Sequence, residues 1–237
     1  MIPKIIHYCW FGRSEIPQLA KDCIASWHKF MPNWEYKLWN EDNFDVTVHP
    51  YTKEAYEAGK YAFVSDYVRL YALKKDGGLY LDVDFEVFKP FDDLLHYPAF
   101  AGYEGSKHSP VMMGVLASEP DGAWVNAQVY NYSGRHFILP DGSMDMMTNV
   151  VYNTRNMVSH GFVCDGIEKD FGGLHVFPVD YFCPRQTTGE YFLSDNTYCD
   201  HKGLDSWSDS KHRPLLLRIV GPKMSIKLIK IKRKLFG

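Results

Sequence analysis

Hydrophobic positions along the chain follow two periods in turn, and their order predicts an α/β fold. Residues 2–10 are rich in Ile and aromatic side chains and predict a strand that ends at the turn 11–12. The segment 17–31 predicts a helix that begins at a proline, and 34–39 predicts a second strand with alternating large side chains. A strand, helix, strand order with short connections is typical of a Rossmann-like sheet.

The strongest helical period lies over residues 56–75, where apolar side chains recur every three or four positions. On another face of this helix, Asp66 and Arg69 lie three positions apart and are therefore neighbours. The pair Gly77-Gly78 ends the helix, and a buried strand follows at once.

That strand ends in two carboxylates, Asp82 and Asp84. Because side chains alternate along a strand, we expect the two to point to the same side, where they repel unless a cation or proton lies between them. The strand ends at the carboxyl edge of the sheet, where open α/β folds bind ligands. Oxygen ligands favour a hard cation, so the pair predicts a Mg²⁺ or Mn²⁺ site whose shell a substrate phosphate completes. The alternative is that both side chains merely solvate a strand end.

Shorter elements are expected beyond residue 90. The pattern predicts strands at 99–103, 111–117 and 174–179 and helices at 124–132 and 144–158. The polar, glycine-containing link 104–110 is a candidate substrate loop. Neither an internal repeat nor a low-complexity linker occurs, which favours one domain, 1–222, followed by a tail, 223–237.

The composition is that of a globular protein. Of 237 residues, 46% are hydrophobic and 23% charged, while 16% are aromatic and offer faces on which sugars and bases stack. Five cysteines without a C-x-x-C pair favour a reduced, cytosolic protein. The N-terminal sequence does not predict a signal peptide, and no window approaches the roughly 18 apolar residues of a membrane span. We expect no nucleic-acid partner.

The tail 223–237 differs in charge from the rest of the chain. It holds six basic side chains and no acidic one, so that the net charge of −3 leaves −9 for residues 1–222. Its apolar side chains fall on one stripe of a helix, with lysines on the adjacent stripe. Such a basic amphipathic helix is suited to the surface of an anionic membrane. A helix docked on the domain with a solvated basic face is the alternative.

Three motifs, in this order and spacing, resemble glycosyltransferase family 32. They are I-I-H-Y-C-W-F-G at 5–12, S-D-x-x-R at 65–69 and G-G-L-Y-L-D-x-D at 77–84. His201 with Ser206-Trp207 resembles a fourth signature of that family, and the resemblance covers about residues 3 to 207. The resemblance implies a GT-A-type mixed sheet flanked by helices, a nucleotide-sugar donor, Mn²⁺ or Mg²⁺ as cofactor, and retention of anomeric configuration. Among nucleotide-sugars we favour a UDP-sugar.

The resemblance also implies roles for residues of the first two motifs. Trp10 corresponds to the tryptophan that stacks on the nucleotide base, unless it is a core indole at the end of the first strand. Asp66 and Arg69 correspond to the pair that binds the donor sugar and its phosphate. Their alternative is an ion pair on a helix surface, worth only about 0.3–0.5 kcal/mol.

The remaining motifs are expected to complete the donor and metal site. Asp82 corresponds to the aspartate shared between the ribose and the metal, Asp84 to the direct metal ligand, and Tyr80 joins the donor site. His201 and Trp207 are expected to close the site over the diphosphate, with His201 as a further metal ligand. The catalytic set is then Asp66, Arg69 and Asp84. Residues 104–200 carry no motif that matches the family, so the acceptor is not identified.

The expected reaction is hexose transfer from the nucleotide-sugar to a glycan, and a lipid-linked acceptor in bacterial capsule or O-antigen synthesis is favoured. No carboxylate stands out in the sequence as a nucleophile. We therefore expect the acceptor hydroxyl to attack C1 from the same face as that from which the leaving group departs. The departing phosphate oxygen is expected to take the proton of the acceptor hydroxyl. The tail and the resemblance together favour a peripheral enzyme on the cytoplasmic face of the plasma membrane.

Two rival interpretations remain at this point. Haloacid-dehalogenase-type phosphatases also use D-x-D after a strand, but they require Thr or Val two residues after the second aspartate, where this chain has Glu86. A non-catalytic protein that binds a glycan or nucleotide-sugar at a membrane, on a decayed transferase scaffold, is the other rival. Metal-dependent turnover discriminates between it and an enzyme.

Overall fold

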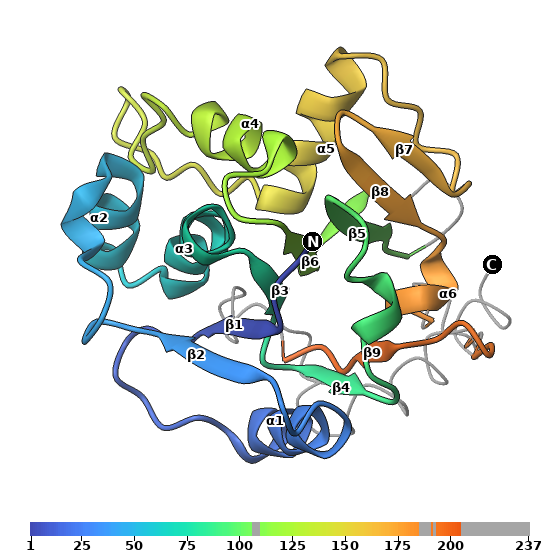
Figure 1. The fold of residues 1–237 in the computed structure, drawn as a ribbon. Coiled ribbons are helices and arrows are strands. Elements are labelled where there is room, and N and C mark those ends of the chain that lie inside the picture. The colour runs from blue at the N-terminus through green and yellow to red at the C-terminus, as the bar shows by residue number, and fades with distance from the viewer. Residues whose placement is uncertain (106–109, 185–190, 192, 205–237) are drawn as a thin grey trace, which may run out of the picture. The chain divides into compact units, whose positions relative to one another are not determined.

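A seven-stranded mixed sheet forms the centre of the described part of the chain (Figure 1). Its strands, in sequence order, are β1 Ile5–Cys9, β2 Glu35–Trp39, β3 Gly78–Leu81, β5 Ala99–Tyr103, β6 Val111–Ser118, β7 Lys169–Phe171 and β8 Leu174–Phe177. In space their order is β2-β1-β3-β6-β5-β8-β7. β1 pairs in parallel with β2 and β3, β5 pairs in parallel with β8, and β6 and β7 run antiparallel to their neighbours. The predicted class, an α/β fold with a mixed sheet, is confirmed.

The computed structural model describes residues 1–105, 110–184, 191 and 193–204, and these belong to one unit, Met1–Leu204. Trp207, the predicted domain boundary at 222 and the predicted tail helix lie outside the described residues. Within them, no helix is both long enough and apolar enough to cross a membrane.

Helices and a small second sheet cover the central sheet (Figure 1). The helices are α1 Gln18–Phe30, α2 Pro50–Glu57, α3 Tyr61–Asp76, α4 Ala123–Asn131, α5 Asn149–Ser159 and α6 Val179–Phe182, with 3-10 turns η1 Val46–Val48 and η2 Asp92–Leu94. The second sheet pairs β4 Phe85–Val87 with β9 Cys199–His201 in antiparallel order.

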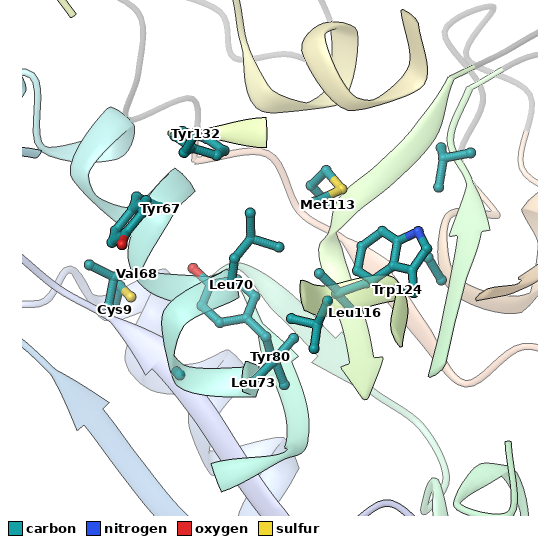
Figure 2. Close-up of a cluster of buried hydrophobic side chains, with 14 of the residues drawn as sticks. Cys9, Tyr67, Val68, Leu70, Leu73, Tyr80, Met113, Leu116, Trp124 and Tyr132 are labelled. Atoms are coloured by element: carbon teal, nitrogen blue, oxygen red, sulfur yellow. The ribbon is translucent and has the colours of Figure 1, made fainter. Parts of the chain in front are cut away.

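Two hydrophobic clusters lie on the two faces of the central sheet. One includes side chains of α3, α4 and β6 together with Tyr80 of β3 (Figure 2). The other includes Trp27 of α1, Phe85 of β4, and Leu79 and Leu81 of β3. Because side chains alternate along a strand, Tyr80 packs on one face while its two neighbours pack on the other. Both faces of β3 are therefore buried up to its last residue.

The helix predicted over 56–75 is divided in the structure. α2 ends at Glu57, and α3 begins only at Tyr61. Gly59 has a φ of +68° in the connection, a conformation that favours glycine and that a continuous helix cannot contain. The sequence analysis missed α2 because the imidazole of His49, which accepts a hydrogen bond from the N–H of Tyr51, is an uncommon N-cap.

The D-x-D segment is also built differently from the prediction. β3 ends at Leu81, and Asp82 to Asp84 form a turn that leads into β4. The N–H of Phe85 closes this turn on the carbonyl of Asp82 at 3.1 Å. The turn, and not strand alternation, therefore sets the directions of the Asp82 and Asp84 side chains. The turn gives the two carboxylates different partners.

The topology fixes where a ligand can bind. From β1 the chain first adds β2 on one side and then, through α2 and α3, adds β3 on the other. The order of the strands thus reverses between β1 and β3, which is the switch point where open α/β sheets hold ligands beyond the carboxyl ends of their strands. Trp10 follows β1 and Asp82 follows β3, so both lie at this point.

Gly78→Ala is expected to destabilise the fold more than Gly59→Ala. Gly78 has a φ of +113°, and a Cβ there would lie 2.5 Å from the carbonyl oxygen of Ile5. Gly59 has a positive φ as well, but a Cβ there would meet nothing within 4 Å. Chemical denaturation should give a loss in the free energy of unfolding of about 1–2 kcal/mol for Gly59→Ala and a larger loss for Gly78→Ala. Equal losses would contradict the close approach of β1 and β3.

Candidate active site

Arg69 of α3 holds the candidate site together. Its Nη2 donates to Oδ1 of Asp66 at 3.0 Å, and its Nη1 donates to Oδ2 of Asp82 at 3.3 Å and to the carbonyl of Met113 at 2.6 Å. The guanidinium also lies 4.6 Å from the centre of the Tyr80 ring. Arg69 and Asp66 are only 5% and 7% exposed, so the predicted pair forms, but the alternative of a helix-surface ion pair is wrong.

Burial sets the electrostatics of this pair. Removal from water raises the pKa of Asp66 to about 7, against the opposing effect of the Arg69 charge. Burial lowers the pKa of Arg69, but the surrounding acids, Asp82 first, reverse this and raise it overall. The guanidinium therefore stays charged, while Asp66 is close to the point where it gains or loses a proton.

Asp82 lies at the edge of this cluster and remains partly exposed, with 34% of its side chain accessible. Its Oδ1 accepts a hydrogen bond from the hydroxyl of Tyr80 at 2.8 Å, and its N–H donates to the carbonyl of Gly114 at 2.8 Å. A Cβ on Gly114 would lie 2.8 Å from Oδ2 of Asp82. β6 therefore leaves room for this carboxylate by presenting a glycine to it.

Asp84 faces a different partner, His201 at the end of β9. Its Oδ2 lies 3.1 Å from Nε2 of His201 and accepts a hydrogen bond from the N–H of Leu204 at 2.7 Å. Burial alone would raise the pKa of Asp84 and lower the pKa of His201, because it disfavours the charged form of each group. The contact between the two groups outweighs burial, so the pKa of Asp84 is lowered and the pKa of His201 is raised to about 9. His201, which stacks on Phe85 at 4.6 Å, is therefore an imidazolium at neutral pH.

Trp10 lies at the carboxyl end of β1 and is partly exposed. Its indole N–H donates to the carbonyl of Ser14 at 2.7 Å, and its backbone N–H donates to the carbonyl of Trp39 at 3.0 Å. The indole is therefore not buried in the core, which excludes the alternative that Trp10 is a core residue at the end of the first strand. A tryptophan fixed at the switch point suits the predicted role of stacking on a base, and this role stays a prediction.

Residues 17–101 match the protein family described as "Glycosyltransferase sugar-binding region containing DXD motif". Over these residues the chain is similar to the DXD-containing glycosyltransferases. The matched segment contains the Arg69 cluster and both carboxylates of the D-x-D, and it supports a sugar transferase over the rival phosphatase class. The match supports the predicted family resemblance over this segment, and the predicted mixed sheet flanked by helices is present in the structure.

Curated proteins of known name are similar to part of the chain. Inositol phosphoceramide mannosyltransferase 3 of Schizosaccharomyces pombe is 38% identical over 103 residues, 42% of this chain and 29% of the relative. Mannosyl phosphorylinositol ceramide synthase SUR1 of Saccharomyces cerevisiae is 31% identical over 104 residues, 42% of this chain and 27% of the relative. The chain thus spans less than a third of either relative. Among solved structures, PaToxG Glycosyltransferase aligns with a TM-score of 0.45 and 20% identity over 56% of this chain and 60% of that chain.

DXD-containing glycosyltransferases imply a divalent cation, and the residues present fit one in part. Carboxylate oxygens of Asp82 and Asp84 are the ligands that Mg²⁺ and Mn²⁺ prefer. His201 fits only after it loses the proton that it shares with Asp84. Within the described residues, no three His, Cys, Asp or Glu side chains are arranged to hold a metal. Joint metal binding by Asp82, Asp84 and His201 therefore stays a prediction.

The structure adds one acidic residue that the sequence analysis did not single out. Glu104 follows β5, and the charges that act on it are those of His201 and Asp82. Burial, the largest effect, raises the pKa of Glu104. Glu104 directly follows an apolar strand in the sequence, as Asp82 does. This pattern at 99–104 could have identified Glu104 as a candidate site residue.

A polar cluster next to Asp66 was also missed. The N-terminal N–H of α5, at Asn149, contributes to stabilising the charged form of Asp66. The guanidinium of Arg135 lies 3.9 to 5.0 Å from the ring centres of Tyr51, Tyr132 and Tyr152 and pairs with Asp145 at 2.8 Å. These residues come from α2, α4, α5 and their connections, which carry no family motif. Sequence reasoning could not bring them together.

Arg69→Met is expected to destabilise the protein strongly. Methionine keeps much of the side-chain volume but leaves the buried Asp66 without its cation, which typically costs about 3–5 kcal/mol. Arg13→Met is the matched control, because Arg13 pairs with Asp42 on the surface, where the two side chains are 61% and 65% exposed. Chemical denaturation of both variants is the measurement. No measurable change is expected for the control, and an equally small change for Arg69→Met would contradict the role of Arg69.

Proposed function

We propose that this chain is a metal-dependent, retaining glycosyltransferase that moves a hexose from a nucleotide-sugar to a hydroxyl group of a glycan or lipid-linked acceptor. The observation that carries the proposal is the charge of the site. Four acidic side chains, Asp66, Asp82, Asp84 and Glu104, lie at the site with two basic ones, Arg69 and His201, and burial raises the pKa of Asp66 to about 7 and also raises the pKa of Glu104. An anionic diphosphate enters such a site only together with additional positive charge. This charge balance favours a divalent cation.

The described residues suit the breaking of the bond between the sugar and the diphosphate. A divalent cation held by Asp82 and Asp84 would neutralise the negative charge that develops on the leaving diphosphate. Arg69 is fixed by four hydrogen bonds, so that its charge is already in place when that negative charge develops. Asp66, at the buried end of the same network, is placed to accept hydrogen bonds from sugar hydroxyls and orient C1.

The printed names of the relatives bear on the donor. Two fungal relatives are named for mannosyl transfer to inositol phosphoceramide or for synthesis of its mannosyl form. These names favour mannose as the sugar and agree with the lipid-linked acceptor that the sequence analysis favoured, whereas the sequence analysis favoured a UDP-sugar as donor and a capsule or O-antigen glycan as product. Both donor classes present a diphosphate to the same residues, and they differ in the base that Trp10 is proposed to stack on. The donor is therefore best found with a panel.

Asp84→Asn is expected to abolish metal-dependent turnover. The full chain, with Mn²⁺ or with a chelator, is incubated with UDP-glucose, UDP-galactose, their N-acetyl forms and GDP-mannose, and release of nucleotide is measured. One donor should be hydrolysed only with metal, and Asp84→Asn should lower the rate by about 100-fold or more, because the variant loses a carboxylate that would hold the cation which neutralises the leaving diphosphate.

Asp92→Asn is the control for this measurement, because Asp92 pairs with Lys4 on the surface. It should leave the rate unchanged. Calorimetric binding of a nucleotide-sugar without turnover of any donor would favour the alternative, a non-catalytic binding protein on a transferase scaffold. Turnover that persists in the chelator would contradict metal dependence.

We also propose that the basic segment 223–237 holds the enzyme on the cytoplasmic face of an anionic membrane. The support is its six basic side chains, which are not balanced by any acid. Deletion of residues 223–237 should abolish co-sedimentation with vesicles that contain phosphatidylglycerol. Vesicles of phosphatidylcholine alone should bind neither protein. If the shortened chain sediments with anionic vesicles as the full chain does, the tail is not the anchor.

A further inference from the structure

The loop that follows β1, residues 10–14, carries Trp10 and has a backbone that needs support. Gly12 has a φ of +94° and Arg13 a φ of +57°, a region that L side chains rarely adopt. Arg13 and Ser14 are exposed, and the bond from the indole N–H of Trp10 to the carbonyl of Ser14 lies within the loop itself. Backbone of this kind persists only where the surrounding structure holds it. The position of the Trp10 ring therefore depends on contacts from outside the loop.

The turn that follows β2, residues 40–44, is the neighbour of this loop. β1 and β2 are parallel and paired, so the loop and the turn leave the sheet side by side. The turn is closed by its own hydrogen bonds, because the N–H groups of Asn43 and Phe44 both donate to the carbonyl of Asn40, at 3.3 and 3.0 Å. The side-chain amide of Asn43 also donates to the carbonyl of Leu38 in β2 at 2.7 Å. The turn is therefore a fixed support beside the loop.

Glu41 of this turn bonds to the middle of the loop. Its Oε1 accepts a hydrogen bond from the N–H of Gly12 at 2.6 Å and another from the hydroxyl of Tyr56 in α2 at 3.0 Å. Hydrogen bonds to a carboxylate are about twice as strong as those between neutral groups. Arg13 and Asp42 also join the two segments, but both side chains are largely exposed, so this ion pair contributes little. The bond from Gly12 to Glu41 is therefore the stronger link.

Tyr61, the first residue of α3, contacts the same point of the loop. A Cβ on Gly12 would lie 2.3 Å from Cε2 of the Tyr61 ring, so this ring lies directly against the glycine backbone. The ring of Tyr61 also lies 5.3 Å from the ring of Tyr56, centre to centre. Gly12 is thus bonded to Glu41 and packed against α3, the helix that carries Arg69.

We propose that Glu41 is a positioning residue that holds Trp10 in place for the base of the nucleotide-sugar. This assignment deepens the function proposed above and rests on it. Glu41 acts through the backbone of Gly12, which lies in the segment that the indole bond of Trp10 spans. Arg69, which is proposed to act on the diphosphate, is held by α3, the turn after β3 and β6 instead. Glu41 therefore serves recognition of the base and not the transfer step.

The test measures binding of UDP, GDP and inorganic pyrophosphate to the full chain by calorimetry in the presence of Mg²⁺. Without the anchor, the loop keeps its binding conformation in only a fraction of the molecules, and the Kd rises by the inverse of that fraction. Glu41→Ala should raise the Kd of the preferred nucleoside diphosphate about 10-fold. The Kd of pyrophosphate, which has no base, should stay within about twofold of the wild type, because it depends on Arg69 and the cation. For the donor found with the panel, KM should rise by the same factor while kcat stays unchanged.

Three further variants show whether Glu41 acts in this way. Glu41→Gln keeps an oxygen that can accept the bond from Gly12, so it should retain most of the affinity. In a Trp10→Ala variant, Glu41→Ala should weaken binding no further, because a residue that acts only through Trp10 has nothing left to position. Glu35→Ala is the matched control, because Glu35 is an exposed acid at the opposite end of β2. It should leave every Kd unchanged.

Each outcome decides the assignment. Unchanged binding of the nucleoside diphosphate in Glu41→Ala overturns it and leaves the glycosyltransferase proposal standing. Equal losses for the nucleoside diphosphate and pyrophosphate, or a further loss in the Trp10→Ala variant, indicate a general structural role and also overturn it. A wild-type chain that binds neither UDP nor GDP overturns the assignment as well. If the wild type shows the expected losses but hydrolyses no donor, Glu41 still positions Trp10 at a nucleotide site, and only the proposed transfer reaction is overturned.

Discussion

The buried guanidinium of Arg69 bonds at once to α3, to the turn after β3 and to β6, through Asp66, Asp82 and the carbonyl of Met113. All three groups accept a hydrogen bond from the same cation, in an environment where an unpaired charge is costly. The helix, the strand end and the neighbouring strand are therefore fixed relative to one another by electrostatics as well as by packing. A displacement of any one of them removes a hydrogen bond from the buried guanidinium.

The rest of the site is arranged around this constraint in two halves. On one side lie the buried Asp66, the N-terminus of α5 and the Arg135 cluster. On the other side, the turn after β3 presents Asp84 to His201, while Asp82 remains partly exposed between the halves. The first half offers a buried acid beside a guanidinium, and the second offers a buried carboxylate paired with a partly exposed imidazole.

The sequence predicts the parts of this arrangement that depend on local periodicity. The i, i+3 spacing places Asp66 beside Arg69, and apolar runs locate β3, β5 and β6 to within a residue or so. It does not predict contacts set by tertiary structure. The burial of the pair depends on β6 and α4, the proximity of Glu104 depends on sheet order, and the turn at 82–84 depends on the pairing of β4 with β9. None of these tertiary contacts produces a periodic pattern in the sequence around Asp66, Arg69, Glu104 or residues 82–84.

The pairing of β4 with β9 has a consequence for how the protein reaches its working state. Phe85 opposes His201 in this ladder, although 116 positions of chain separate the two. Contacts between such distant segments carry a large loop-closure cost, and they form late compared with helices and neighbouring strands. A nascent chain can therefore assemble β1, β3 and the Arg69 cluster before β9 exists. The half of the site that contains Asp84 becomes complete only when β9 has been synthesised and has paired with β4.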